Sequence, residues 1–338
     1  MFYESSLCDR YLDNLKEELK KYSSFCFDSI YIGGGTPTSL NISQLERLFN
    51  MLLPYQSDNS FITIETNPDL DSNKIELLSK FNVNRISIGI QTFDKEYLKL
   101  INRSNDYSKV CELINVLKKN NINDINVDLI YGFNNQTVER LDKDLDLFLK
   151  LDINHISTYA LQVEEMTMLY NKKYQTLDDD NESKLYEHIV NRLKENNIYR
   201  YEVSNFARKG FESKHNLIYW NNNEYGGCGL HASSYIDGVR RTNTKSLTKY
   251  LKGEYQDYEE ILTVEDEKFY FIMLSLRKIE GVSLKVYKNK YNEDFYLAKK
   301  NIVDALINDE LLEIKDGYLK ITSDNYFIMD FILKKLLF

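Results

Sequence analysis

The sequence predicts an α/β protein that begins with an open parallel sheet and ends in a smaller α+β region. Two observations predict the sheet: strand and helix patterns alternate through the first half of the 338 residues, and glycine or proline follows several strands. A third observation predicts the smaller region, because from Thr263 onward short helices are followed by a two-strand hairpin pattern.

Each element of the first half has its own local signal. Strands are short apolar runs between turn residues, and helices show apolar residues three and four apart. Asn41 is a typical N-cap, and Pro54 stops the helix that it begins. The expected order is helix 10–22, strand 28–33, helix 41–53, strand 61–66, helix 71–80, strand 85–91, helices 95–101 and 107–120, strand 125–132, helix 138–150 and strand 155–161.

The second half has a different character. A long helix is expected over 177–196, and the stretch 199–235 is rich in aromatic residues, Asn and Gly. In "LLEIKDGYLKIT" the pair Asp316-Gly317 predicts a hairpin turn, and a last helix follows over 326–337. We therefore expect three domains: a core over 1–170, an extension over 171–255 and a winged-helix-like domain over 256–338.

Composition excludes several classes of function. The net charge is −9 and lysines are interspersed with acidic residues, so the sequence shows no basic patch of the kind that binds nucleic acid. No run of 18 apolar residues and no signal peptide occur, which predicts a cytoplasmic protein without membrane spans. The spacing of the four cysteines matches no metal site, so we expect free thiols at Cys8, Cys26, Cys111 and Cys228.

The stretch "SIYIGGGTPTSL" predicts a ligand site. Three successive glycines at a strand end are costly in backbone entropy and are tolerated where a ligand must approach the main chain. The carboxyl ends of parallel strands meet at one edge of the sheet, where ligands of such folds bind. Each residue alone has an ordinary structural explanation, but together the following are expected at one rim: Gly33, Gly34, Gly35, Thr36, Glu65, Asn67, Gln91 and Asp128.

Several motifs carry a family resemblance. In order, "YIGGGTPTSL", "ETNP", "RISIGIQTF", "INRSNDY" and "VDLIYG" resemble the radical S-adenosylmethionine (SAM) proteins related to oxygen-independent coproporphyrinogen III oxidase. The segment "SKHNLIYWNNNEYGGCGLHASSY" is similar to the HNxxYW region of HemW-type heme chaperones within that group. The resemblance covers nearly the whole chain and implies a radical-SAM-type partial (β/α) barrel that lacks its first strand.

The resemblance assigns SAM to the rim. The backbone at the glycines would meet the amino group of its methionine part, and an arginine would pair with the carboxylate. Polar side chains at neighbouring strand ends would contact the ammonium, the ribose or the adenine side. The implied SAM residues are Gly34, Gly35, Thr36, Glu65, Gln91, Arg103 and Asp128.

The same resemblance implies heme at the HNxxYW segment. His215, Asn216, Tyr219 and Trp220 are the implied heme residues, with the histidine as an iron ligand and the rings as apolar walls. Packing of a core histidine and of the single Trp in the chain is the structural alternative. The implied function is a chaperone that passes heme to an acceptor protein. The alternative is a radical enzyme that oxidises coproporphyrinogen III, so whether the chain is an enzyme stays open and no catalytic residue is assigned.

One departure concerns iron and sulfur. The family holds a [4Fe-4S] cluster on a CxxxCxxC motif that this sequence lacks, and "MFYESS" resembles the stretch after its last cysteine. We expect either a longer natural N-terminus or a shortened form. The implied cofactors are SAM and heme, with a cluster that these cysteines cannot ligate. The expected partners are heme and an unidentified acceptor, without nucleic acid, while transient membrane association stays open.

Overall fold

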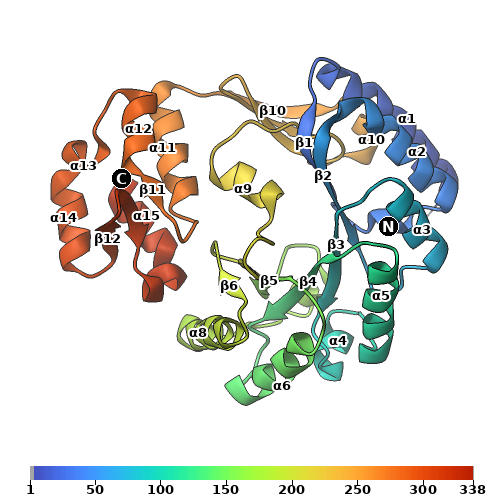
Figure 1. Cartoon of the computed structure of the whole chain (residues 1–338), viewed down its shortest axis with the longest axis horizontal. Helices are drawn as coiled ribbons and strands as arrows, with labels where there is room; N and C mark the ends of the chain where they lie inside the picture. Colours follow the sequence, from blue (N-terminus) through green and yellow to red (C-terminus); the bar gives the residue numbers. More distant parts are fainter. Residues whose placement is uncertain (1–3, 338) are drawn as a thin grey trace. The chain divides into compact units, whose positions relative to one another are not determined.

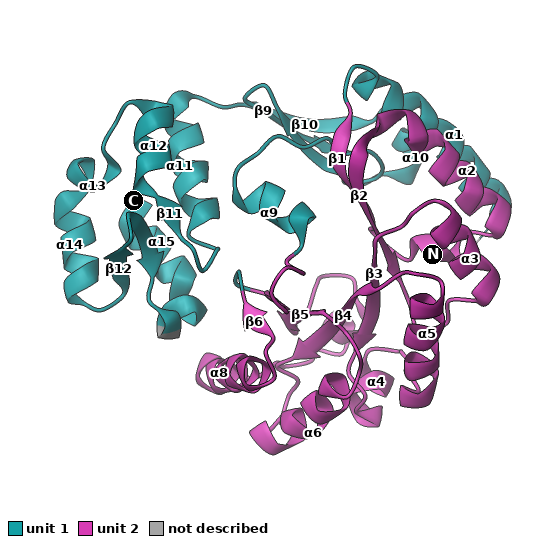
Figure 2. Cartoon of the chain, viewed as in Figure 1, with its two compact units in different colours: residues 1–25, 201–203, 213–338 teal, residues 26–200, 204–212 magenta. Residues whose placement is uncertain are grey.

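The computed structural model describes residues 4–337 and divides the chain into two compact units (Figures 1 and 2). Unit 2 contains Cys26–Arg200 and Ser204–Glu212. Unit 1 contains the chain up to Phe25, Tyr201–Val203 and everything from Ser213 onward. The three expected domains, 1–170, 171–255 and 256–338, stay a prediction.

A seven-stranded sheet forms the centre of unit 2, in the order β1-β2-β3-β4-β5-β7-β6. Its first five strands are parallel, which confirms the predicted α/β class, and β7 and β6 continue it in antiparallel pairing. The sequence patterns missed β6 and β7 because they are too short to show a period. The strands are β1 (Phe27–Ile32), β2 (Gln56–Thr66), β3 (Arg85–Gln91), β4 (Asp124–Tyr131), β5 (His155–Ala160), β6 (Tyr199–Arg200) and β7 (Asn205–Ala207).

The helices of unit 2 begin where the sequence supplies caps. Asn41 and Gln44 form a capping box, whereas Asp71 and Asp94 cap the next two helices with a side-chain oxygen that accepts from backbone N–H groups of the first turn. No helix in residues 4–337 is long and apolar enough to cross a membrane. The bounds are α2 (Ile42–Leu52), α3 (Ser72–Lys80), α4 (Lys95–Leu100), α5 (Tyr107–Lys119), α6 (Val138–Leu149), α7 (Met168–Asn171) and α8 (Asp179–Glu195), with 3₁₀ turns η2 (Pro37–Ser39) and η3 (Leu53–Tyr55).

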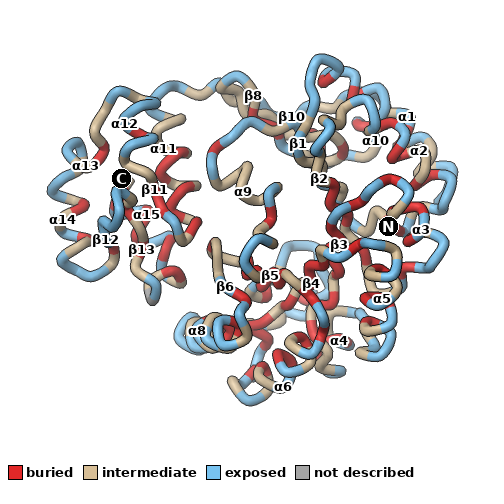
Figure 3. The backbone as a smooth tube through the Cα atoms, viewed as in Figure 1, coloured by how far each residue is buried: buried red, intermediate tan, exposed pale blue. Residues whose placement is uncertain are grey.

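The two faces of the parallel sheet differ in chemistry. One face is apolar, with Ile64, Ile86, Ile88, Val127 and Ile156 almost inaccessible to solvent. Figure 3 shows buried residues along the central strands in red. Alternate residues point to the opposite face, because successive strand side chains point to opposite sides. That face is polar, and its cross-strand partners include Glu65 beside Ser87, Asn126 beside His155 and Asp128 beside Ser157.

Unit 1 begins with a helix held by a buried carboxylate. The Glu18 carboxylate in α1 accepts hydrogen bonds from the Gly229 N–H (2.8 Å), the Asn243 amide (2.6 Å) and the Tyr250 hydroxyl (2.7 Å). These bonds attach α1 to a three-stranded sheet of order β10-β9-β8. The elements are α1 (Ser5–Leu19), η1 (Lys20–Tyr22), α9 (Lys214–Trp220), β8 (Ser233–Ile236), β9 (Val239–Asn243), α10 (Leu247–Tyr250) and β10 (Gln256–Ile261).

The last part of unit 1 has the predicted winged-helix pattern. The expected hairpin turn is present: Asp316 and Gly317 both have positive φ, 53° and 81°, which is the geometry of a type I′ turn. A third strand completes the sheet in the order β11-β13-β12. The elements are α11 (Val264–Ser275), β11 (Val282–Ser283), α12 (Leu284–Tyr291), α13 (Phe295–Ala298), α14 (Lys300–Asn308), β12 (Leu312–Lys315), β13 (Tyr318–Ile321), η4 (Ser323–Ile328) and α15 (Met329–Leu337).

Candidate functional site

The Glu65 carboxylate connects the ends of β1 and β2. Its two oxygens accept from the Tyr31 hydroxyl (2.8 Å) and from the Gly34 N–H (3.1 Å). A Cβ on Gly33 would lie 2.7 Å from Glu65 Oε1, so a side chain there would have to displace the Glu65 carboxylate. Burial and the neighbouring Glu65 charge raise the pKa of Tyr31, which keeps the phenol protonated and able to donate.

Gly34 and Gly35 expose their backbone. Their φ angles are 89° and 153°, the range that favours glycine, and a Cβ on either would meet none of the described residues within 4 Å. Thr36 follows as the N-cap of η2, and its carbonyl accepts from the Ser39 N–H (2.8 Å). The glycines therefore leave space beside the main chain, as the sequence predicts for a ligand approach.

Gln91 and Arg103 lie together over the end of β3. A Cβ on Gly89 would be 3.1 Å from Gln91 Nε2 and 3.5 Å from Arg103 Nη1. Arg103 Nη1 also donates to the Gly89 carbonyl (3.2 Å). Gln91 has a φ of 73° and follows an irregularity in the β3–β4 register. The amide and the guanidinium thus lie next to each other at the strand end.

Asp128 belongs to a network of hydrogen-bonded polar side chains on β3, β4 and β5. Asn126 donates to Asp128 Oδ1 (2.9 Å) and to Ser87 Oγ (2.7 Å), and its own Oδ1 is bonded to His155 Nδ1 (2.6 Å) and Ser157 Oγ (3.1 Å). Burial, reinforced by the Glu65 charge, raises the pKa of Asp128 to about 6. Burial lowers the pKa of His155 well below its usual value, so its imidazole is neutral.

Sequence reasoning missed most of this network. Tyr31, Ser87, Asn126, His155 and Ser157 lie within strands, whose sequence patterns predict the strands but no site residues. A signal was available, because the polar residues alternate with apolar ones in "HISTYA" and "INVDLIY". Such alternation predicts a sheet with one polar face.

The HNLIYW segment forms its own short helix, α9, in unit 1. His215 Nε2 and the Tyr219 hydroxyl are hydrogen-bonded at 2.8 Å, and their rings meet edge to face. Burial lowers the pKa of His215 to about 4, so the imidazole is neutral at physiological pH. The Asn216 N–H donates to Ser213, the N-cap of this helix, and Trp220 closes its last turn. The four predicted heme residues are thus on one helical turn and a half.

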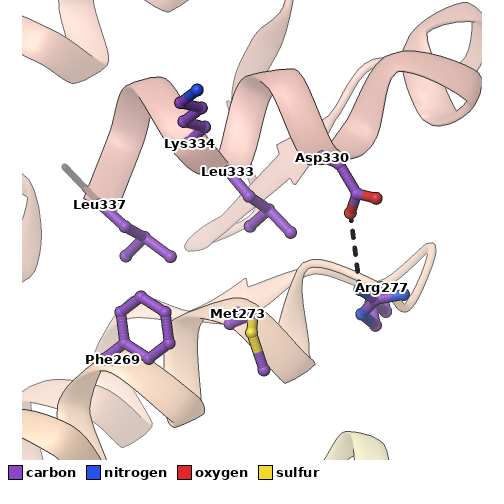
Figure 4. Close-up of a pocket in the computed structure, with 7 residues that line it drawn as sticks. All are labelled: Phe269, Met273, Arg277, Asp330, Leu333, Lys334 and Leu337. Carbon is purple, nitrogen blue, oxygen red and sulfur yellow. Dashed lines mark hydrogen bonds and ion pairs between the residues drawn. The ribbon is translucent and has the colours of Figure 1, made fainter.

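A pocket of about 460 Å³ lies between α11 and α15 in the same unit (Figure 4). Phe269, Met273, Leu333 and Leu337 give it an apolar lining. Lys334, Arg277 and Asp330 contribute charged groups, and the last two approach within 3.5 Å of each other.

The described cysteines do not form a cluster site. Within residues 4–337, no group of three or more His, Cys, Asp or Glu side chains is placed to hold a metal ion. Cys8, Cys26, Cys111 and Cys228 are unpaired by disulfides. The residues present therefore do not fit a [4Fe-4S] cluster, which needs several thiolates together.

Three kinds of comparison relate the chain to known proteins. The family model of the Radical SAM superfamily matches residues 9–148. The heme chaperone HemW of Lactococcus lactis is 38% identical over 319 residues, covering 90% of this chain and 83% of the relative. HemW of Bacillus subtilis is 36% identical over 342 residues, covering 95% and 89%.

The solved structure of coproporphyrinogen III oxidase HemN from Escherichia coli superimposes with a TM-score of 0.86 at 21% identity. It covers 99% of this chain, and the chain covers 84% of it. At this identity the likeness shows the fold, which is the partial barrel expected from the motifs together with its C-terminal region.

Proposed function

We propose that this chain, which belongs to the HemW family of heme chaperones on a radical SAM core, binds heme and passes it to an acceptor protein. The observation that supports this most directly is the state of His215. Iron binds the neutral imidazole, and burial lowers the pKa of His215 to about 4, so this ring stays neutral even in mildly acidic solution. The alternative, oxidation of coproporphyrinogen III, is supported by likeness of fold alone.

The contact between His215 and Tyr219 bears on release of heme. The Tyr219 hydroxyl is hydrogen-bonded to His215 Nε2 at 2.8 Å, so an iron atom that binds this nitrogen must displace the hydroxyl. On loss of iron the hydroxyl returns, which offsets part of the cost of breaking the iron–nitrogen bond. Such competition lowers the affinity for heme and favours its transfer to an acceptor, as a carrier requires.

The rim in unit 2 fits SAM. Gly34 and Gly35 offer backbone with open space beside it, Arg103 offers a guanidinium for the carboxylate, and Glu65 and Asp128 offer acceptors for ammonium or ribose hydroxyls. SAM is the sulfonium cofactor of the radical SAM superfamily. Thr36 and Gln91 complete the proposed set.

Titration with hemin tests the heme proposal. We expect the parent protein to shift the Soret band of hemin, and His215→Ala to weaken binding by about tenfold or more. His188→Ala is the matched control, because His188 lies in unit 2 and pairs with Asp142 (2.8 Å). Equal hemin affinity of His215→Ala and the parent would remove His215 as the ligand, and absence of binding by the parent would reject the proposed function.

A further inference from the structure

Three cations meet the end of α9. Arg277, Lys278 and Arg240 each contact one of the three consecutive residues Trp220, Asn221 and Asn222. The Arg277 guanidinium lies 5.7 Å from the Trp220 ring centre, Lys278 Nζ donates to Asn221 Oδ1 (2.5 Å), and Arg240 Nη2 donates to Asn222 Oδ1 (3.1 Å).

Cations near a helix C-terminus commonly satisfy its last carbonyls. Here those carbonyls already have partners, because Leu217 O, Tyr219 O and Ile218 O accept from the backbone N–H groups of residues 221–223. The cations instead bind the side-chain oxygens of the two asparagines. Each asparagine amide therefore has its oxygen fixed by a cation, which leaves its NH₂ group to donate elsewhere.

Three buried donors in this cluster have no acceptor. Trp220 Nε1, Asn222 Nδ2 and Arg240 Nε are all inaccessible and make no hydrogen bond to residues 4–337. Asn222 as a whole is only 6% exposed. Buried polar groups are normally satisfied, since an unpaired one is costly. All three are N–H donors, so the missing partner is an acceptor.

The cluster is also positively charged. Lys278 is 8% exposed, and burial lowers its pKa, while its carboxylate neighbour Glu280 lies at 3.8 Å. Arg240 is held between the rings of Tyr235 (4.6 Å) and Tyr270 (3.9 Å), which fixes the guanidinium without neutralising it. Asp330 also lies 3.5 Å from Arg277, so two carboxylates face three cations. The remaining positive charge favours an anionic acceptor such as a carboxylate.

The position of Arg277 indicates an anion with an apolar body. Arg277 approaches Trp220 and also lines the apolar pocket between α11 and α15 (Figure 4). A small hydrophilic anion would gain nothing from Phe269, Met273 and Leu333. Heme combines a flat apolar ring with two propionates, which matches both parts.

We propose that the end of α9, together with Arg240, Arg277 and Lys278, binds the propionate carboxylates of heme. The site deepens the proposed heme function and rests on it. In this arrangement His215 lies in the first turn of α9, and the carboxylate donors lie at the C-terminal end of the helix, next to Tyr219. Recognition of the propionates then orients the ring on the helix independently of the iron.

The test compares iron protoporphyrin IX with its dimethyl ester, which lacks the carboxylate charges. We expect the parent to bind the diacid at least about tenfold more tightly than the diester, equivalent to about 1.4 kcal/mol. Lys278→Met keeps most of the apolar stem of the side chain and removes its charge, so it should reduce this preference several-fold. Arg241→Leu is the matched control, because Arg241 lies beside Arg240 on β9 but pairs with Glu259 (2.7 Å).

Circular dichroism and thermal unfolding check the fold of each variant. If Lys278→Met is destabilised, Arg277→Leu replaces it, and the same loss of preference is expected. Equal binding of diacid and diester by the parent overturns the carboxylate site while leaving heme binding intact. Displacement of the diacid by millimolar inorganic phosphate would indicate a general anion site and overturn the porphyrin assignment. Absence of binding by either porphyrin rejects the proposed function itself.

Discussion

Replacing Asp128 by Asn removes a charge that the folded protein holds at a cost. The carboxylate lies in the polar network of unit 2 and accepts from Asn126 at 2.9 Å. Burial, with the nearby Glu65 charge, raises its pKa from 3.8 to about 6, despite hydrogen bonds from Asn126, Ser157 and Ser87 that lower it. Asparagine has the same shape and keeps an oxygen for the Asn126 donor, so the substitution tests charge alone.

The size of the effect follows from linkage. A carboxyl group with a raised folded pKa contributes full stability below its unfolded pKa of 3.8, and this contribution is lost as the pH rises through about 6. Each pKa unit corresponds to about 1.4 kcal/mol. Asp128→Asn should therefore raise the free energy of unfolding by about 3 kcal/mol at pH 8 and by about half as much at pH 5.

Urea unfolding at pH 5, 6, 7 and 8, monitored by circular dichroism without SAM, measures this difference. Asp94→Asn is a control of opposite sign, because hydrogen bonding and charge pairing with Arg140 lower the pKa of Asp94. Asp94→Asn should lower the free energy of unfolding at pH 7, and this decrease should become smaller at lower pH. A stability change for Asp128→Asn that is independent of pH, or destabilising at pH 8, would refute the argument. Weaker SAM binding by the more stable variant would fit a site that retains a costly charge for its ligand.

The remaining predictions concern the rim, the heme helix and the thiols. Gly34→Val should abolish SAM binding in calorimetry, whereas Gly210→Val, at a matching φ of 88° against 89° and also in open space, should carry the same backbone strain and leave binding intact; equal loss in both would assign the effect to strain. The lowered pKa of His215 means that the unfolded chain takes up a proton before the folded protein does, so stability is lost as the pH falls from 6.5 to about 4. His215→Gln should therefore make the free energy of unfolding less sensitive to pH in this range, and an unchanged pH profile would contradict this. Anaerobic iron–sulfur reconstitution of this chain should give no stoichiometric [4Fe-4S] signal, since its cysteines match no ligand spacing, and about four irons per chain would disprove it.

Local signals in the sequence were sufficient for much of the fold. The five parallel strands, the capped helices and the Asp316-Gly317 hairpin follow from periodicity, caps and turn residues, which act over a few neighbours along the chain. The same rule applied to Asp237-Gly238, with φ of 53° and 72°, would have found the missed β8–β9 hairpin. The rim was predictable too, because parallel strands necessarily end at one edge.

Contacts between distant residues needed the tertiary structure. Glu65 meets Tyr31 and Gly34 only through the β1–β2 register, and Asn126 collects its partners from β3 and β5. Glu18 reaches residues more than two hundred positions away, and the cations around α9 come from separate segments. No local pattern specifies such pairs, because sheet register and helix packing are set by the burial of whole faces. The sequence by itself therefore determined the parallel strands and their helices, the rim and the family, whereas packing alone decided which charges are buried together and which donors are left for a ligand.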